Sequence, residues 1–417
     1  MITRDSCLAR DRDDPLRGLR ELFDIAPSLI YLDGNSLGVL PRSVAARVAH
    51  TIEHEWGRGL IGSWNSADWI NLPARVGAKI ARLIGARDDE VIAADSTSVN
   101  LFKVLSAALA LRPQRKVILS EAGNFPTDLY IAQGLIRQLG RGYELRLVDR
   151  ANLEAAIDDT VAVAMLTQVD YRTGSLLDMA GITARLHQAG ALALWDLAHS
   201  AGALPVELNA AQADFAVGCG YKYLNGGPGA PAFLFVAQHH QASFTQPLSG
   251  WMGHAAPFEF DPAYRPAEGI GRYLCGTPPV LGLVALEAGV DTVLAAEPLG
   301  GLDAIRRKSL ALTDLFVELV SARCAGHGLN SITPAGAARG SQVSWALPNG
   351  SQAYAVVQAL IARGVVGDFR SPDVMRFGFT PLYLGYADVW DAVEHLRAVL
   401  AAREWDRPEF LQRQAVT

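Results

Sequence analysis

The sequence predicts an α/β protein that has a large domain with a mostly parallel mixed sheet and a smaller α/β C-terminal domain. Strand-like and helix-like segments alternate between residues 91 and 236, which is typical of βαβ units and a parallel sheet. After about residue 305 the pattern changes to a long helix followed by strand, helix and strand segments. A length of 417 residues also exceeds that of one ordinary domain.

The predicted strands are short apolar runs, and the predicted helices carry apolar residues at helical spacing. In chain order the strands are 91–95, 116–121, 143–149, 161–170, 191–199, 215–222 and 231–236, with helices over 96–112, 124–140 and 178–190. The C-terminal part should hold a helix over 301–324, a strand over 341–347, a helix over 353–364 and a strand over 374–379. We therefore predict an N-terminal segment (1–67) that packs with the small domain, a large domain (68–305) and a small domain (306–417).

Composition and charge exclude several classes of protein. Half of the residues are hydrophobic and 19% are charged, as in soluble globular proteins. The net charge of −6 argues against nucleic-acid and membrane-surface partners. The first twenty residues lack the apolar stretch of a signal peptide, and no apolar run has the length of a membrane span. The four cysteines have neither metal-type nor redox-type spacing, so we expect reduced thiols, no metal site and a cytoplasmic location.

Polar residues follow several of the predicted strands, at the edge where ligands collect in parallel sheets. Each has an ordinary explanation alone: serine or threonine caps a helix, aspartate forms a turn, histidine is structural, and lysine lies along the surface. Their convergence at successive strand ends is harder to explain in that way. The residues concerned are Thr97 and Ser98, Thr167, Asp196, His199 and Lys222.

This set of groups matches the needs of pyridoxal 5'-phosphate. The cofactor requires a lysine for a Schiff base, a carboxylate beside its pyridine nitrogen and an anion site for its phosphate. Lys222 and Asp196 offer the first two, and the helix start at Thr97 and Ser98 offers the third. Phe125, directly before Pro126 at a predicted helix start, offers an aromatic face for the ring.

On these and further motifs the chain resembles the kynureninases, which are fold-type I pyridoxal-phosphate enzymes of the aspartate-aminotransferase-like class. The similarity extends over nearly the whole chain. Its more general part, "WDLAHSAGA" (195–203), is shared with sister families, whereas "YKYLNGGPG" (221–229), "SGWMGH" (249–254) and "MRFGFTPLY" (375–383) together are specific to kynureninase. The other matching segments are "IYLDGNSLG" (30–38), "GLIGSWNSADW" (59–69), "STSVNLFKVLSAAL" (96–109), "NFPTDLYIA" (124–132) and "RYLCGTPP" (272–279).

The resemblance implies a role for each matching residue. Lys222 and Asp196 are implied as the Schiff-base lysine and the pyridinium partner, with Tyr221 as a candidate proton donor. Arg376 is implied as the residue that holds the substrate carboxylate, with Trp64 and Ser36 on the substrate side. The implied cofactor contacts are Thr97, Ser98, Phe125, Pro126, Thr127, Asp128, Thr167, Asp196, His199, Tyr221 and Lys222, with Trp251 and Thr277 lent by a partner subunit.

The implied activity is hydrolysis of L-kynurenine, and possibly of 3-hydroxy-L-kynurenine, to anthranilate or 3-hydroxyanthranilate and L-alanine in tryptophan degradation. The implied assembly is a homodimer with shared active sites.

Two alternatives stay open. A cysteine desulfurase or selenocysteine lyase of the same fold would need a reactive cysteine on a flexible loop, and Cys324 ends a predicted helix. An inactive scaffold would have lost Lys222 or Asp196, and both are present.

Overall fold

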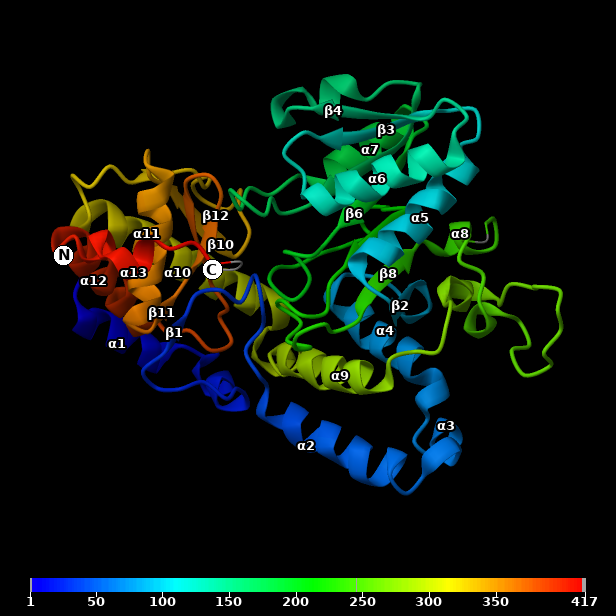
Figure 1. The fold of residues 1–417 in the computed structure, drawn as a ribbon, viewed down its shortest axis with the longest axis horizontal. Helices are drawn as coiled ribbons and strands as arrows, with labels where there is room; N and C mark the ends of the chain where they lie inside the picture. The colour runs from blue at the N-terminus through cyan, green and yellow to red at the C-terminus, as the bar shows by residue number, and fades with distance from the viewer. Residues whose placement is uncertain (1, 245, 415–417) are drawn as a thin grey trace.

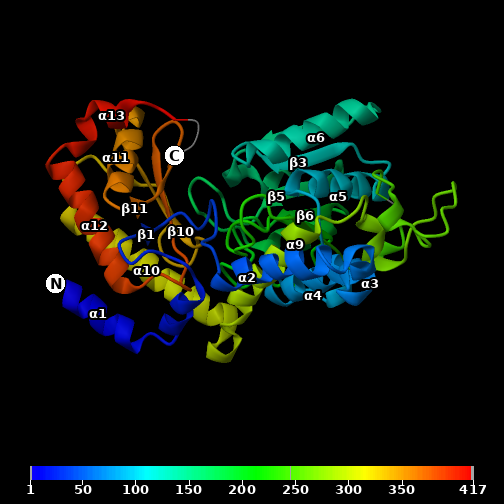
Figure 2. The same cartoon turned by 60° about the horizontal axis from the view of Figure 1, so that its bottom comes forward.

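The computed structural model describes residues 2–244 and 246–414 and has two lobes (Figures 1 and 2). The larger lobe holds a seven-stranded sheet in the order β2-β8-β7-β6-β5-β3-β4. The pairs from β7 to β4 are parallel, and β8 runs antiparallel to both neighbours, so the predicted mostly parallel mixed sheet is confirmed. The strands are β2 (Val91–Ala94), β3 (Val117–Glu121), β4 (Glu144–Val148), β5 (Val161–Thr167), β6 (Leu192–Asp196), β7 (Phe215–Gly218) and β8 (Ala232–Val236).

Helices cover both faces of this sheet. Residues of α5 (Thr97–Leu111) and α6 (Pro126–Leu139) pack with one set of strand side chains, among them Met165 and Val217. The alternate strand side chains, such as Trp195 on β6, belong to a second core built with α4 (Leu72–Leu83), α7 (Met179–Gln188) and α9 (Val280–Leu294). Burial on both faces explains why the central strands are continuous apolar runs in the sequence.

The smaller lobe holds a four-stranded antiparallel sheet in the order β12-β13-β10-β9. Its strands are β9 (Asn330–Ser331), β10 (Gln342–Ala346), β12 (Asp368–Arg370) and β13 (Val374–Gly378), and its helices are α10 (Gly301–Arg323), α11 (Gly350–Ala362), α12 (Tyr386–Ala401) and α13 (Pro408–Leu411). The predicted boundary at 305/306 falls within the first two turns of α10. Within residues 2–244 and 246–414, none of the helices is long and apolar enough to cross a membrane.

The N-terminal segment contacts both lobes. Helix α1 (Arg4–Asp13) packs on α12, and β1 (Ile30–Tyr31) pairs in parallel with β11 (Val365–Val366) of the smaller lobe. Helix α2 (Arg42–His50) then packs along α9 of the larger lobe, and α3 (Ser63–Ser66) follows it, as both views show (Figures 1 and 2). The division of the chain at 67/68 and 305/306 stays a prediction.

The parallel strands bring their carboxyl ends to one edge of the sheet. Since β8 is antiparallel to both β2 and β7, strand β2 ends at the same edge as β5, β6 and β7. Thr167 is the last residue of β5, and Asp196 is the last residue of β6. Thr97 begins α5 shortly after β2, and Lys222 follows β7 by four residues. The fold therefore gathers the polar strand ends on which the sequence prediction rests.

Candidate active site

A cavity of about 330 Å³ opens at this edge of the sheet. Its volume lies at the small end of the range of roughly 300–1,000 Å³ that is usual for small-molecule sites. Most of the predicted cofactor contacts line it: Thr97, Ser98, Phe125, Thr127, Asp128, Thr167, Asp196, His199, Tyr221 and Lys222. Pro126 lies between two of these residues as the first residue of α6. The structure therefore brings together groups from the ends of the three strands β5, β6 and β7 and from the starts of the two helices α5 and α6.

The loop that carries Lys222 is closed by its own backbone. The amide of Gly226 donates to the carbonyl of Gly220 (2.9 Å), and the amide of Asn225 donates to the carbonyl of Lys222 (3.0 Å). A Cβ atom at Gly220 would lie 2.2 Å from the carbonyl oxygen of Pro231, so only glycine fits there. The loop presents the Lys222 amine to the cavity.

The glycines that follow serve the turn rather than the cavity. Gly227 and Gly229 have φ of +84° and +71°, a conformation that favours glycine. Neither lines the cavity, so these two glycines shape the turn that follows Lys222.

The amine of Lys222 lies among titratable groups whose pKa values are shifted by burial. Its Nζ is 3.0 Å from Nε2 of His199. Burial, together with the positive Lys222, holds the pKa of His199 well below its usual range, so the ring stays neutral. Burial raises the pKa of Asp196, and Lys222 opposes that rise. Burial and then Asp196 raise the pKa of Asp128 well above its usual range. The site therefore holds one lysine between two carboxyl groups and a neutral imidazole.

Two buried polar atoms at the cavity wall point to a polar ligand. Within the described residues, Oδ2 of Asp128 and Nδ1 of His199 have no hydrogen-bond partner. Buried polar groups without partners are uncommon and call for an explanation such as a ligand. A carbonyl cofactor with ring hydroxyl and ring nitrogen atoms would supply partners at this depth of the cavity.

The start of α5 also borders the cavity and offers groups that suit an anion. Ser96 caps the helix, since its side chain accepts a hydrogen bond from the amide of Val99 at 3.3 Å. The side chains of Thr97 and Ser98 follow at the cavity wall. The positive end of the helix dipole and these hydroxyl groups suit a phosphate. The donor set thus fits pyridoxal phosphate at its aldehyde, ring and phosphate.

Sequence reasoning missed Tyr171 as a cavity residue. Its ring meets the ring of Phe125 edge-on, with centroids 5.3 Å apart and an interplanar angle of 80°. Tyr171 lies in the loop between β5 and α7, where no periodic pattern marks it. Ser96, Ala198 and Cys219 also line the cavity without having been predicted. Their nearness in sequence to Thr97, His199 and Lys222 was the available signal.

Arg376 lies deep between the lobes and already has protein partners. It is 1% exposed on β13, which is flanked by β12 and β10 and is not an edge strand. Its guanidinium pairs with Asp368 and donates to Oγ of Ser36 at 2.7 Å and to the carbonyl of Tyr171 at 2.8 Å. A guanidinium buried on an apolar strand needs such partners, because an unpaired charge would be costly to bury. The bond to Tyr171 also connects Arg376 to the wall of the Lys222 cavity.

Besides Arg376, Ser36 and Pro126, three predicted residues do not line the Lys222 cavity of their own chain. Trp64 and Thr277 border a separate, mostly apolar cavity of about 460 Å³ beside Trp56. Trp251 is 38% exposed and meets Phe258 edge-on, with ring centroids 5.6 Å apart. Trp64 belongs to α3, and Trp251 and Thr277 lie in the stretch between α8 and α9.

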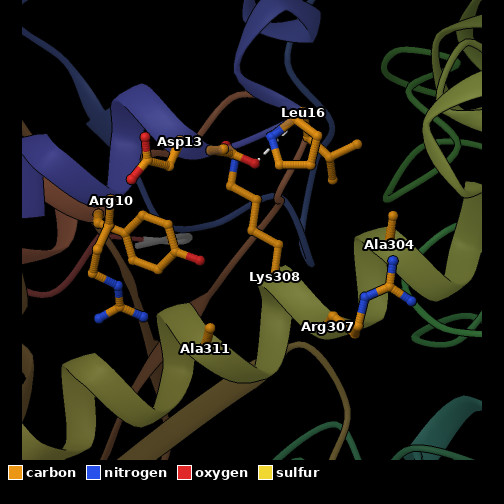
Figure 3. Close-up of a pocket in the computed structure, with 10 residues that line it drawn as sticks. Arg10, Asp13, Leu16, Ala304, Arg307, Lys308 and Ala311 are labelled. Carbon is orange, nitrogen blue, oxygen red and sulfur yellow. Dashed lines mark hydrogen bonds and ion pairs between the residues drawn. The ribbon is translucent and has the colours of Figure 1, made fainter.

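A further cavity, of about 410 Å³, lies between the N-terminal segment and α10. Figure 3 shows Lys308 rising from α10 toward the segment of Asp13 and Leu16, with Arg10 and Arg307 on opposite sides. Lys308 is buried, pairs with Asp14 at 2.6 Å and donates to the carbonyl of Pro381 at 2.6 Å. Because its amine is engaged by these partners, this cavity does not offer a second reactive lysine.

Solved structures of similar fold include a cysteine desulfurase and an enzyme that carries a PLP cofactor. The chain matches the apo cysteine desulfurase of Thermococcus onnurineus NA1 with a TM-score of 0.77 at 19% identity, over 92% of this chain and 98% of that one. It matches a C-DES variant with glycine covalently linked to its PLP cofactor with a TM-score of 0.74 at 18% identity, over 92% and 98%. These likenesses establish the fold-type I architecture.

Sequence comparisons are more specific. The chain is 58% identical to the kynureninase of Burkholderia mallei (strain SAVP1) and 54% identical to that of Pseudomonas fluorescens, in each case over 100% of both chains. Residues 305–396 match the family described as the kynureninase C-terminal domain. The desulfurase alternative is not favoured, because desulfurases match only in fold. This chain belongs to the kynureninase family.

Proposed function

We propose that the Lys222 cavity is the active site at which this chain hydrolyses L-kynurenine to anthranilate and L-alanine with pyridoxal 5'-phosphate. The observation that carries the proposal is the meeting of a lysine amine, a buried carboxylate and a helix start in one cavity of a kynureninase-family chain. When bound, the cofactor supplies an electron sink that weakens the bonds at the α-carbon of an amino acid.

Each part of the cofactor has a residue that would hold it. Lys222 would bind the aldehyde covalently, and Phe125 would cover one face of the ring. Asp196 would keep the pyridine nitrogen protonated, since a carboxylate buried beside a basic nitrogen favours its charged form. The remaining contacts would orient the ring hydroxyl and the phosphate: Thr97, Ser98, Pro126, Thr127, Asp128, Thr167, His199 and Tyr221.

Lys222 and Tyr221 would move the protons of the reaction. A free Lys222 amine in this cavity would act as the base for the proton on the α-carbon of the substrate. The neutral imidazole of His199, 3.0 Å from this amine, orients it without competing for positive charge. Burial raises the pKa of Tyr221, so its phenol stays protonated at neutral pH and is our candidate proton donor.

Arg376 would hold the substrate carboxylate. A guanidinium offers two parallel donors to a carboxylate, which fixes the orientation of the α-carbon above the ring. The hydroxyl of Ser36 accepts a hydrogen bond from the Arg376 guanidinium at 2.7 Å. Ser36 would therefore lie beside the bound carboxylate. Trp64 would contact the aromatic part of the substrate. Since Arg376 lies on the smaller lobe, carboxylate binding would tie the two lobes together.

The functional unit is a cytoplasmic homodimer in this proposal. Trp251 and Thr277 are exposed and do not line the Lys222 cavity of their own chain, which is the placement expected of residues lent to a partner. Trp56 and Leu281, which are also exposed, border the apolar cavity beside Thr277. Apolar surface of this kind is typical of a protein–protein interface.

The test is turnover by the purified, cofactor-loaded protein. L-kynurenine and 3-hydroxy-L-kynurenine are supplied separately, with release of anthranilate or 3-hydroxyanthranilate followed by fluorescence and of alanine by chromatography. L-cysteine and L-selenocysteine serve as the comparison substrates of the sister enzymes. Equimolar anthranilate and alanine are expected from L-kynurenine. Release of sulfide from cysteine without cleavage of either kynurenine would contradict the proposal.

A further inference from the structure

Three histidines surround one buried aspartate at the edge of the large sheet opposite to Lys222. Asp214 directly precedes β7, and its side chain is 3% exposed. Its Oδ2 lies 2.8 Å from Nε2 of His187, and its Oδ1 lies 2.7 Å from Nε2 of His240. Nε2 of His239 lies 4.0 Å from the same Oδ1. One atom each of Asp214, His239 and His240 lies within 4.8 Å of the others.

The carboxylate and one imidazole are held firmly in place. The amide of Ala193 donates to Oδ2 of Asp214 at 2.8 Å, and His187 binds the same oxygen. The ring of His240 stacks on Phe215 with centroids 5.5 Å apart and an interplanar angle of 9°. His187 and the Ala193 amide therefore hold Oδ2 of Asp214, while its Oδ1 is directed at the two neighbouring histidines His239 and His240.

Hydrogen bonding alone accounts for His187 and His240 but not for His239. At 4.0 Å its Nε2 is beyond hydrogen-bond distance of Oδ1, yet its ring centroid lies only 3.9 Å from that of His240. His239 therefore lies beside the carboxylate without a hydrogen bond to it, and an imidazole beside a carboxylate is a donor pair that ligates metals.

We propose that Asp214, His239 and His240 form a binding site for a divalent transition metal ion of the zinc type. Imidazole nitrogen and carboxylate oxygen suit zinc, and three protein ligands leave a position for water. Bond lengths of about 2.0–2.2 Å to each ligand place N and O atoms about 3.3 Å apart in a tetrahedral site. The 2.7 Å and 4.0 Å separations lie on either side of that value, so a small opening at His240 and an inward turn of His239 complete the site.

The proton balance of binding is simple. To bind the metal, Nε2 of His240 must lose the proton that it shares with Asp214. In a neutral ring this proton moves to Nδ1. In a charged ring, which keeps its Nδ1 proton, the Nε2 proton is released to water. The metal replaces this proton between the nitrogen and Oδ1. His187 and the Ala193 amide keep holding Oδ2, in the way that outer hydrogen bonds orient metal ligands.

The site acts on stability rather than on chemistry. It would join α8 (Gln238–Gln241) to the start of β7, whereas Lys222 lies beyond the other end of that strand. A ligand that binds only the folded chain raises its stability. Zinc is therefore expected to raise the unfolding temperature of the cofactor-loaded protein.

The experiment titrates zinc chloride into the full-length, cofactor-loaded protein by calorimetry and repeats thermal unfolding with zinc and with chelator. The variant is His239→Ala, whose exposed side chain leaves the existing hydrogen bonds of Asp214 in place. The matched control is His50→Ala, because His50 and His54 form another pair of neighbouring imidazoles, with centroids 4.7 Å apart on α2 and the turn after it. Equal unfolding temperatures in chelator show that both variants fold.

We expect one zinc ion per chain to bind the wild type and the His50→Ala variant alike. His239→Ala should weaken this binding by at least about tenfold, the low end of the loss caused by removing even an outer partner of a ligand. The zinc-induced rise in unfolding temperature should disappear with it. The proposal is overturned if His239→Ala binds zinc as the wild type does, if His50→Ala removes the binding, or if the wild type takes up no zinc below millimolar concentration.

Discussion

Lys222 is a lysine whose amine the fold keeps in a cavity instead of in water. Its nearest polar neighbour is the ring nitrogen of a histidine at 3.0 Å, and Asp196 and Asp128 act on it electrostatically. Lysines bound to solvent or to a surface carboxylate do not have this environment. The amine of Lys103, for example, is more deeply buried than that of Lys222, but it pairs with Asp95 at 2.5 Å and donates to the carbonyl of Tyr273. Reactivity with an aldehyde is therefore expected of Lys222 in particular.

Replacing Lys222 by alanine should abolish turnover and covalent attachment of the cofactor while leaving a folded chain. Borohydride reduction followed by mass spectrometry should find the cofactor fixed to the peptide of residue 222 in the wild type and on no peptide in the variant. Lys116→Ala, a change at a surface lysine that contacts the ring of Tyr143, is the control and should behave as the wild type. Cofactor fixed to another lysine in the Lys222 variant would contradict the assignment.

Replacing Asp196 by alanine should slow the chemical step. The loss of a charge positioned at the reacting group typically costs about 3–4 kcal/mol, or two to three orders of magnitude in turnover. Single-turnover kinetics with saturating cofactor measure the effect. Asp196→Asn separates charge from shape, because its amide oxygen can still accept the hydrogen bond that Asp196 receives from the Ala198 amide at 2.7 Å. Near-normal turnover in both variants would rule out the pyridinium role.

For single residues, the sequence predicts which side chains gather at the site. It predicts less well which partners each side chain binds. Thr167, Asp196 and Lys222 follow apolar strands, so their position at one sheet edge follows from local pattern and parallel topology. Tyr171 comes from a loop without periodicity. The partner of Arg376 comes from another strand, since the register of β12 against β13 places Asp368 opposite it. Long-range register of this kind has no signature in a local stretch of sequence.

Strand β13 connects the active site to the smaller lobe. Arg376 donates from β13 to the carbonyl of Tyr171, which belongs to the larger lobe, while Asp368 on β12 neutralises its charge. A substrate carboxylate must therefore share this guanidinium with Asp368. Sharing is possible because the fork of an arginine offers five donors.

Replacing Arg376 by lysine should weaken substrate binding by roughly 1.5–3 kcal/mol, the value of a hydrogen bond to a charged group. A lysine cannot bind Asp368 and a substrate carboxylate with the same planar fork. The measurement compares the binding of L-kynurenine with that of an analogue that lacks the α-carboxylate. Arg172→Lys, which alters a half-buried arginine paired with Asp373 at 2.8 Å, is the control. Equal weakening for both ligands would show that Arg376 does not contact the carboxylate.

The N-terminal segment is held to α10 by a buried ion pair. Lys308 and Asp14 have side chains 6% and 5% exposed and lie 2.6 Å apart. Removing one partner of a buried pair leaves an uncompensated charge, at a cost of about 3–5 kcal/mol. We expect Asp14→Asn to fall near the lower value, because the 410 Å³ cavity beside Lys308 can admit water.

The midpoint of urea unfolding measures this loss. Asp13→Asn changes the exposed neighbouring carboxylate and should leave the midpoint unchanged. The double change Asp14→Asn with Lys308→Met should recover part of the stability, since it removes the unpaired charge as well. An unchanged midpoint in Asp14→Asn would show that the pair contributes nothing to the attachment of the segment.

For the whole molecule, the arrangement of the two lobes follows from the sequence only in part. The alternating pattern predicts the large sheet, and the later helix-rich pattern predicts the small lobe. The path of residues 42–66 along α9 was not predicted, because α2 has no buried residues of its own in the single chain. When the apolar face of a helix is not buried within its own chain, the apolar spacing does not indicate where the helix packs. The exposed side chains Trp56, Leu60 and Ile61 after this helix favour a partner that covers them.

Mixing two inactive variants tests whether that partner is a second copy that completes the site. Lys222→Ala lacks the reactive amine, and Trp251→Ala lacks the tryptophan that we propose is lent across the interface. In a hybrid dimer one of the two sites combines the intact Lys222 of one chain with the intact Trp251 of the other. If subunits of a two-fold dimer re-assort randomly, roughly a quarter of the wild-type activity should return. Native mass spectrometry of chains with different tags measures the exchange, and each variant alone sets the baseline. Because the hybrid restores a complete site only when the two residues belong to different chains, exchange without recovery would show that each site is built from a single chain.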